Sequence, residues 1–113
     1  MEKINKGGNT KVKKFYGGKF LDKLKLEEQG IFYPIKLEYY KRIEEESKTK
    51  QKSFGISIVK TEYIKDNVKI ETKEVKNLSN DERKIEKLLS MFKEFDVTPV
   101  SVDYLINDLK SNI

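Results

Sequence analysis

Side chains that could carry out chemistry are few in this chain. The acidic run Glu44–Glu46 supplies oxygen ligands of the kind that calcium and magnesium prefer, but no glycine-spaced calcium loop accompanies it, which favours a solvated turn. Ser57, Ser79 and Ser101 are possible nucleophiles, yet the chain has no histidine to activate them. It has no cysteine either, which excludes a thiolate zinc site and a thiol nucleophile. We therefore expect no catalytic residue, no metal site and no cofactor; an enzyme that uses carboxylates alone would need an acidic cleft.

Four tyrosines offer binding rather than catalysis, and they fall in segments whose alternation predicts β-strands. They are Tyr33, Tyr39, Tyr40 and Tyr63. Tyrosine rings give a large contact area at little entropic cost, so an exposed group of them suits the recognition of a protein partner. At least two of the four should point away from a covering helical layer. The competing interpretation is ordinary cross-strand packing.

A second candidate site lies near the N-terminus, where cations and aromatic rings are interleaved. Its residues are Lys11, Lys13, Lys14, Phe15, Tyr16 and Lys19. Proteins that bind single-stranded nucleic acid use this combination, with lysines on phosphates and rings stacked on bases. Docking of the aromatic rings onto the domain is the competing interpretation. The formal net charge of the chain is +5, although an AT-rich genome would also enrich lysine through codon usage.

The length of 113 residues corresponds to one domain with one core. Residues 1–19 contain paired glycines at Gly7-Gly8 and Gly17-Gly18 and little apolar periodicity. This composition predicts a basic arm that is flexible or conditionally ordered. The domain itself is then expected to occupy residues 20–113.

Alternation of apolar and polar residues predicts the strands. Strands are expected over residues 20–26, 31–40 and 53–64, with a further strand from Val68. The polar stretch 44–52 is expected to be a long hairpin connection, and Asp66-Asn67 a tight turn. Val75 and Leu78 are out of phase with Val68, which predicts a bulge near Thr72.

The C-terminal third predicts two helices. Ser79 and Glu82 have the spacing of a capping box, and an apolar stripe follows at helical spacing, formed by Ile85, Leu88, Leu89, Phe92 and Phe95. Residues 96–99 interrupt this stripe, and a shorter stripe follows, formed by Val102, Leu105, Ile106 and Leu109. The predicted fold class is therefore α+β, an antiparallel meander of three or four strands with two C-terminal helices packed on one face.

Several of these segments together resemble a known family. They are the strand Ser53–Ile58, the helix entry Asn77-Leu78-Ser79, Leu88-Leu89, and Val97–Val100 before a short helix. The combination is similar to a family of small clostridial (Firmicutes) proteins of unknown function, from about Gly30 to Leu109. The resemblance implies a clostridial or phage-derived source, and it supplies no catalytic residues.

The resulting functional hypothesis is a small, non-enzymatic regulatory or adaptor protein that binds another protein through the tyrosine-bearing sheet face or an unpaired sheet edge. The alternative is a nucleic-acid-associated accessory factor, for example beside a DNA recombinase or a transcription complex, that uses the basic arm. No apolar run approaches the roughly 20 residues that span a bilayer, so we expect no membrane partner and a cytoplasmic location.

Overall fold

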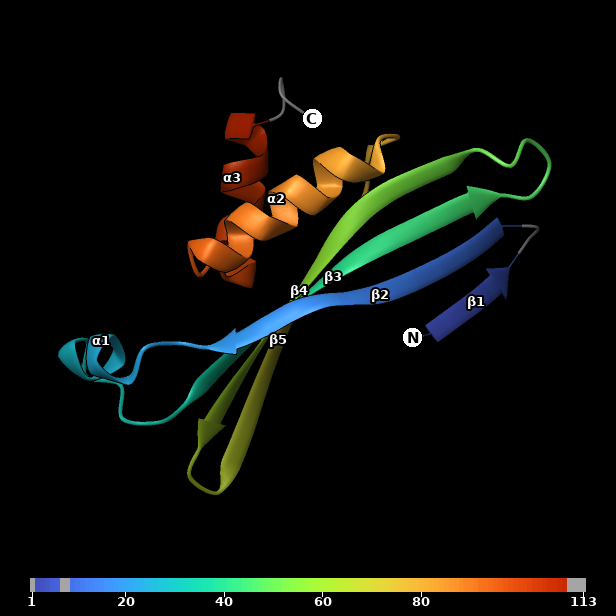
Figure 1. The fold of residues 1–113 in the computed structure, drawn as a ribbon. Coiled ribbons are helices and arrows are strands. Elements are labelled where there is room, and N and C mark those ends of the chain that lie inside the picture. The colour runs from blue at the N-terminus through green and yellow to red at the C-terminus, as the bar shows by residue number, and fades with distance from the viewer. Residues whose placement is uncertain (1, 7–8, 110–113) are drawn as a thin grey trace.

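The computed structural model of the chain describes residues 2–6 and 9–109, with side chains described from residue 9 to residue 109. A five-stranded antiparallel sheet has the order β1-β2-β3-β4-β5, and two C-terminal helices cover one of its faces (Figure 1). In chain order the elements are β1 Glu2–Lys6, β2 Asn9–Phe20, α1 Lys23–Glu28, β3 Ile35–Glu46, β4 Lys52–Ile64, β5 Asn67–Ser79, α2 Glu82–Glu94, the 3₁₀ turn η1 Pro99–Ser101, and α3 Val102–Leu109. The predicted α+β meander with helices on one face is confirmed, and the sheet is larger than expected.

The additional strands come from the segment expected to be an arm. β2 pairs with β3 along its length, from Asn9 opposite Glu46 to Phe20 opposite Lys36. A bulge between Phe15 and Gly17 shifts the register, so side-chain alternation changes phase in the middle of the strand. This phase change and the glycines conceal the period-2 pattern in the sequence. The described part of residues 1–19 therefore belongs to the sheet, while residues 1 and 7–8 lie outside the described residues.

Residues 20–26 were expected to be a strand, and this prediction is wrong. Phe20 ends β2, and the helix α1 begins at Lys23. Asp22 is its N-cap, since its carboxylate accepts hydrogen bonds from the backbone amides of Leu24 at 2.8 Å and Lys25 at 3.4 Å. Leu26 is buried. The apolar alternation is therefore not one side of a sheet: in the helix Leu24 and Leu26 point to opposite sides, and Leu24 is 69% exposed.

The meander β3-β4-β5 follows the predicted strands with shifted boundaries. β3 continues to Glu46, so the connection to β4 is shorter than the expected 44–52. The β4–β5 turn contains Asp66 at φ 63°, as its position predicted. The bulge lies not at Thr72 but where Phe54 opposes Ser79 and Ile56 opposes Val75. Gly55 occupies this point, and a Cβ atom there would overlap the carbonyl oxygen of Val75.

The core lies between the sheet and the helices α2 and α3. Its fully buried side chains include Leu37, Tyr39, Ile56, Ile58, Ile85, Leu89, Phe92 and Val102. The predicted stripe of α2 is confirmed except at Phe95, which is the C-cap residue and 67% exposed. Asp96, with φ 55°, ends this helix at the predicted break.

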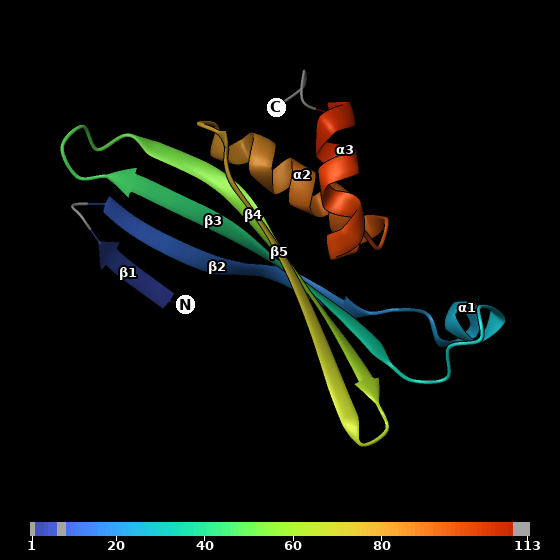
Figure 2. The ribbon, with the colours of Figure 1, turned by 180° about the vertical axis from the view of Figure 1, so that it is seen from behind.

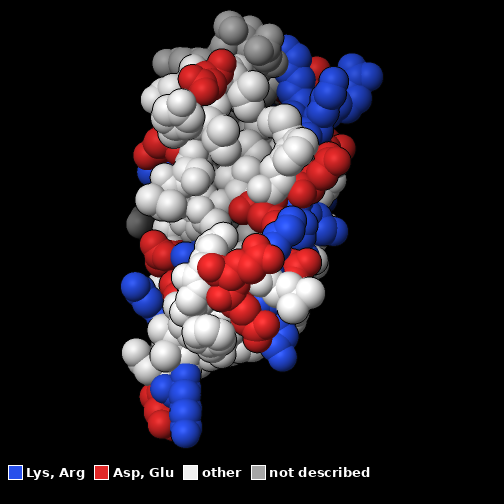
Figure 3. All heavy atoms as spheres, turned by 90° about the vertical axis from the view of Figure 1, so that its left-hand side faces the viewer, with Lys and Arg blue, Asp and Glu red and all other residues white. Residues whose placement is uncertain are grey.

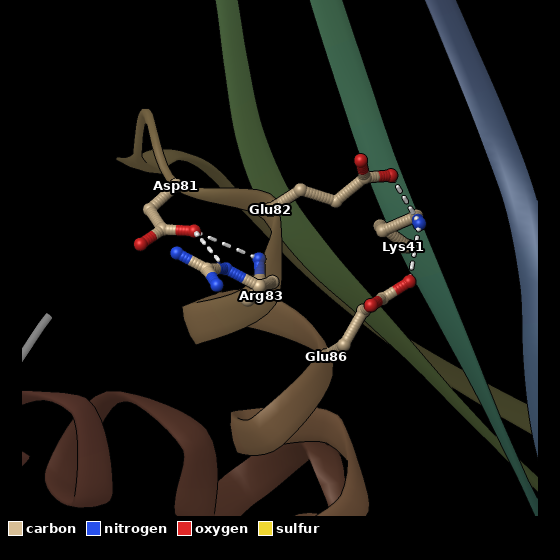
Figure 4. A network of polar contacts seen from close by, with 5 residues as sticks. All are labelled: Lys41, Asp81, Glu82, Arg83 and Glu86. Carbon is tan, nitrogen blue, oxygen red and sulfur yellow. Dashed lines mark hydrogen bonds and ion pairs between the residues drawn. The ribbon is translucent and has the colours of Figure 1, made fainter.

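A buried lysine connects the sheet to the start of α2. Lys41, on the helix-covered face of β3, donates from Nζ to Glu82 at 2.5 Å and Glu86 at 2.8 Å (Figure 4). The expected capping box of Ser79 and Glu82 does not form, because the helix begins two residues later and Glu82, its first residue, binds Lys41. Asp81 is the N-cap and accepts from the amide of Arg83 at 3.0 Å, whereas the Ser79 hydroxyl accepts from the amide of Asp81.

No helix in the described part of the chain is long and apolar enough to cross a membrane.

Candidate binding face of the sheet

The side of the sheet that faces away from α2 and α3 is called the open face here. In an antiparallel pair, directly opposed residues point to the same side, and neighbours along a strand point to opposite sides. Leu37 and Tyr39 point into the core, so Lys36, Glu38 and Tyr40 lie on the open face. The register extends this face to the neighbouring strands, where it includes Lys11, Lys13, Phe15, Phe20, Tyr63, Val68, Ile70 and Glu74.

One aromatic cluster on the open face joins β2 to β3. Phe15 lies opposite Tyr40, and their rings meet edge to face at 5.5 Å between centroids. Lys13 places its Nζ 4.6 Å from the centroid of the Tyr40 ring. Phe15 remains 60% exposed. This cluster therefore presents an aromatic surface with a cation at its margin.

A second cluster repeats this arrangement nearer the end that carries α1. Phe20 and Tyr63 have ring centroids 6.2 Å apart, and Lys36 places its Nζ 5.9 Å from the Tyr63 ring. Phe20 is 59% exposed. The hydrogen bond with Tyr63 is the main cause that raises the pKa of Lys36, and the charge of Glu38 adds to it. Two phenylalanine–tyrosine–lysine clusters thus lie on one side of the sheet.

An apolar pocket with a volume of about 480 Å³ adjoins the second cluster through Phe20. It lies between α1 and the segment before β3, and its lining is Phe20, Leu21, Lys23, Leu26, Glu27, Ile31, Phe32, Tyr33 and Pro34. Tyr33 donates a hydrogen bond to Glu62 at 2.7 Å, which raises the pKa of Tyr33 and lowers that of Glu62. The pocket has the size and lining to accept one large apolar side chain.

The four predicted tyrosines are therefore separated by the fold. Tyr40 and Tyr63 lie on the open face, and Tyr33 lines the pocket. Tyr39 is fully buried and donates to the carbonyl oxygen of Val97 at 2.8 Å, so its prediction as a partner-binding residue is wrong. Burial, with a smaller effect from Asp96, raises the pKa of Tyr39 well above its usual range.

The candidate basic segment is also divided between the two sides of β2. Lys11, Lys13 and Phe15 lie on the open face, and Tyr16 sits at the bulge. Lys14 and Lys19 lie on the opposite side, where Lys19 donates to the carbonyl oxygen of Lys93 at 2.8 Å and pairs with Asp96. Sequence reasoning missed Val68 and Ile70 as members of the exposed surface.

Most charged groups on the open face are paired. Arg42 contacts Glu74 and, at 3.6 Å, Glu44, while Lys36 lies 3.8 Å from Glu38. The register also sets Glu44 opposite Lys11, so the described side chains of the open face carry no net positive charge. Among the described residues, no group of three or more acidic side chains is placed to hold a metal ion.

The helical layer carries exposed apolar side chains of its own. Figure 3, which looks onto the left-hand side of Figure 1, shows uncharged atoms gathered over the helices, with acidic and basic groups interspersed below them. Phe95, Val100 and Tyr104 are exposed by 67%, 81% and 71%. Among the described residues, Phe95 and Tyr104 form no ring pair of the kind seen on the open face.

Residues 20–112 match the model of DUF6514, a family of unknown function. The match includes the second cluster and the pocket, and it leaves out Lys13 and Phe15. It confirms the resemblance to an uncharacterised family that the sequence indicated. Comparison with curated proteins and with solved structures finds no significant match.

Proposed function

Because the chain belongs to DUF6514, a family of unknown function, we propose from its geometry that it is a small, non-enzymatic regulatory or adaptor protein that binds a protein partner through the open face. The observation that carries this proposal is the pair of exposed phenylalanine–tyrosine–lysine clusters on one side of the sheet. Aromatic anchors of this kind supply most of the energy of protein interfaces. The proposal includes a cytoplasmic location and, as the sequence resemblance implies, a clostridial source.

The geometry defines the chemistry of the partner. Phe15 and Phe20 are more than half exposed, and neither belongs to the core. Both rings are therefore available for contact. The pocket beside Phe20 accepts an apolar anchor side chain. Lys13, at the ring of Tyr40 in the first cluster, favours a carboxylate of the partner at that end of the face. The partner is therefore a protein segment that carries a large apolar residue and, farther along the sheet, an acidic one.

A matched pair of variants tests this proposal. Phe15→Ser combined with Phe20→Ser removes both exposed rings of the open face, whereas Tyr104→Ser removes an equally exposed ring from α3. The tagged proteins are used to capture partners from the native cell, and the recovered proteins are quantified. We expect one stoichiometric partner, whose recovery falls at least about tenfold with the double variant and is unchanged with Tyr104→Ser. Capture of no such partner, or equal recovery by both variants, would contradict the proposal.

The same clusters support a second candidate, the binding of single-stranded nucleic acid. Exposed rings on an antiparallel sheet are a common platform for stacking bases. Lys11 and Lys13 supply the cations nearest the first cluster, so about two phosphates would be neutralised. This gives a shallow salt dependence, with a slope of about −1.4 in log affinity against log salt.

Fluorescence anisotropy with labelled single-stranded oligonucleotides separates the two candidates. Micromolar binding with this slope, lost in the Phe15→Ser and Phe20→Ser double variant, would establish the nucleic-acid function and displace the protein-binding proposal. The absence of binding at moderate salt is the result expected if the partner is a protein. Deletion of residues 1–19 is not a suitable test, because it removes β2 from the sheet.

A further inference from the structure

The strand β5 forms an edge of the sheet, since its only neighbour in the sheet order is β4. The helices cover this edge only in part. The ion pair between Lys73 and Asp103 of α3, at 2.8 Å, marks where the helical layer contacts β5. Closer to the turn, the β4–β5 hairpin projects away from the helices (Figures 1 and 2). The segment from Asn67 to Thr72 is thus a free edge.

The backbone groups available at this edge follow from the hydrogen bonding of β4. Tyr63 donates from its amide to the carbonyl of Pro34 at 3.0 Å, so the polar groups of Tyr63 point away from β5. Because backbone groups alternate in direction along a strand, the amide and carbonyl of Glu62 point toward β5, where Lys69 lies opposite. The amides and carbonyls of Val68, Ile70 and Thr72 consequently point outward from the sheet.

The side chains at this edge give only part of the usual protection against pairing. Natural edge strands carry prolines, bulges or charges, lysine above all, that prevent association with another strand. Residues 67–72 contain no proline, and the bulge of this hairpin lies at its far end, at Gly55. Val68 and Ile70 are exposed by 55% and 63% on the open face. The charges that remain, Lys69, Glu71 and Lys73, alternate in sign, so the edge is suited to a strand whose charges complement them.

The charge pattern indicates which strand fits. Lys69, Glu71 and Lys73 alternate in sign along the other side of β5. When two copies of β5 pair antiparallel about a two-fold axis at Ile70, Lys69 of each copy faces Glu71 of the other. An axis at Lys69 or at Glu71 would instead oppose like charges, which is destabilising. An axis at Thr72 would satisfy the charges but place Ile70 against Glu74.

We propose that a second copy of this chain pairs with β5, antiparallel and with Ile70 on the two-fold axis, so that the two sheets become one. The pairing is isologous, so each copy contributes the same edge. The assembly therefore stops at a dimer. It places Val68 of each copy opposite Thr72 of the other and Ile70 against itself on the open face. The inference goes beyond the proposed function, since it concerns the edge and not the aromatic clusters.

Single cysteine variants test both the dimer and its register, because the chain contains no cysteine. In this register the two Ile70 Cα atoms lie about 5.5 Å apart, within the range that a disulfide spans. Two Val68 or two Thr72 Cα atoms lie about 14 Å apart, which is too far. After mild oxidation with oxidised glutathione, Ile70→Cys should form a reducible covalent dimer, whereas Val68→Cys and Thr72→Cys should stay monomeric on a denaturing gel.

Sedimentation velocity of the unmodified chain supplies the independent measurement. We expect a dimer that Ile70→Lys converts to a folded monomer with an unchanged far-ultraviolet circular dichroism spectrum, because Ile70 is exposed and outside the core. A wild-type chain that stays monomeric from micromolar to millimolar concentration overturns the proposal and leaves the edge for a foreign strand. Cross-linking that is strongest with Thr72→Cys, or equal in all three variants, overturns the assigned register.

Discussion

Lys41 provides the sharpest test of how this fold is held together. Its side chain is only 10% exposed, yet it binds two carboxylates that are 44% exposed at Glu82 and 48% exposed at Glu86 (Figure 4). Burial lowers the pKa of Lys41, but the hydrogen bonds to both glutamates outweigh this effect, so its pKa is raised. The lysine is thus the buried partner, and the glutamates are the partners that can return to water.

This asymmetry sets the magnitudes. Replacing either Glu82 or Glu86 with glutamine leaves Lys41 one carboxylate, and half-exposed pairs of this kind contribute about 0.5–1 kcal/mol. Replacing both leaves a buried ammonium without a counter-charge, which costs about 3 kcal/mol, at the low end for a buried pair because the site is near the surface. We expect the double variant to exceed the sum of the single variants by about 1 kcal/mol or more. Lys41→Met should cost less than about 1 kcal/mol, because both glutamates rehydrate.

The same ion pairs make stability depend on pH with a definite sign. The hydrogen bond from Lys41 lowers the pKa of Glu82 in the folded state. The ionised Glu82 carboxylate therefore contributes its full stabilisation above the pKa of the unfolded state, about 4.3. This contribution is lost as the pH falls through the lower pKa of the folded state. Lys41→Met removes this contribution, so the variant should lose less stability than the wild type between pH 6 and about pH 3.

Urea unfolding followed by far-ultraviolet circular dichroism measures these free energies, since the chain has no tryptophan. The four proteins needed for the double-mutant cycle and Lys41→Met are compared at both pH values. Strict additivity of Glu82→Gln and Glu86→Gln would refute the reasoning. So would a Lys41→Met variant that is less stable than the double glutamine variant.

Two further predictions concern the core and the bulge. Gly55→Ala should destabilise the fold by more than about 3 kcal/mol, because the added methyl group would overlap a backbone carbonyl in β5. Gly30 has φ 79° and open space around it, so Gly30→Ala should cost only about 1 kcal/mol. Thermal unfolding compares the two variants, and equal losses would contradict the role of the bulge. Tyr39→Phe should cost about 1–2 kcal/mol by leaving the Val97 carbonyl without its buried donor, whereas Tyr40→Phe should cost less than about 0.5 kcal/mol. Urea titrations that give the same loss for both tyrosines would refute this assignment.

The sequence predicted the meander and the helices because their signals are local and regular. Burial alternates over residues 35–41 of β3, Phe54, Ile56 and Ile58 recur at period 2 in β4, and the stripe of α2 agrees with the chain break at Asp96. These patterns are produced by burial on one side of a regular element, which a single sequence records directly. The helix cap was misassigned because Ser79 has the correct spacing with Glu82, but Glu82 is held by Lys41, a residue that is distant in sequence.

The candidate site was predicted less well, because exposure on a sheet depends on phase. Tyr39 and Tyr40 are adjacent in sequence and have equal propensities, yet one is fully buried and the other lies on the open face. The alternation itself separates them, because Tyr39 is in phase with the apolar Ile35 and Leu37, whereas Tyr40 is in phase with charged residues. The bulge after Phe15 likewise reverses the side to which later residues of β2 point, so the basic segment could not be divided correctly from the sequence.

The composition of the open face is the remaining argument for a binding role. Phe15, Phe20, Val68 and Ile70 are each more than half exposed and contribute little to the core, whereas polar residues at these positions would satisfy the same strand pairing. Scattered exposed apolar residues need no explanation, but these lie on one side of one sheet, beside a pocket and an edge strand. The fold requires only that strand alternation be kept. The apolar character of this face is therefore better explained by what contacts it.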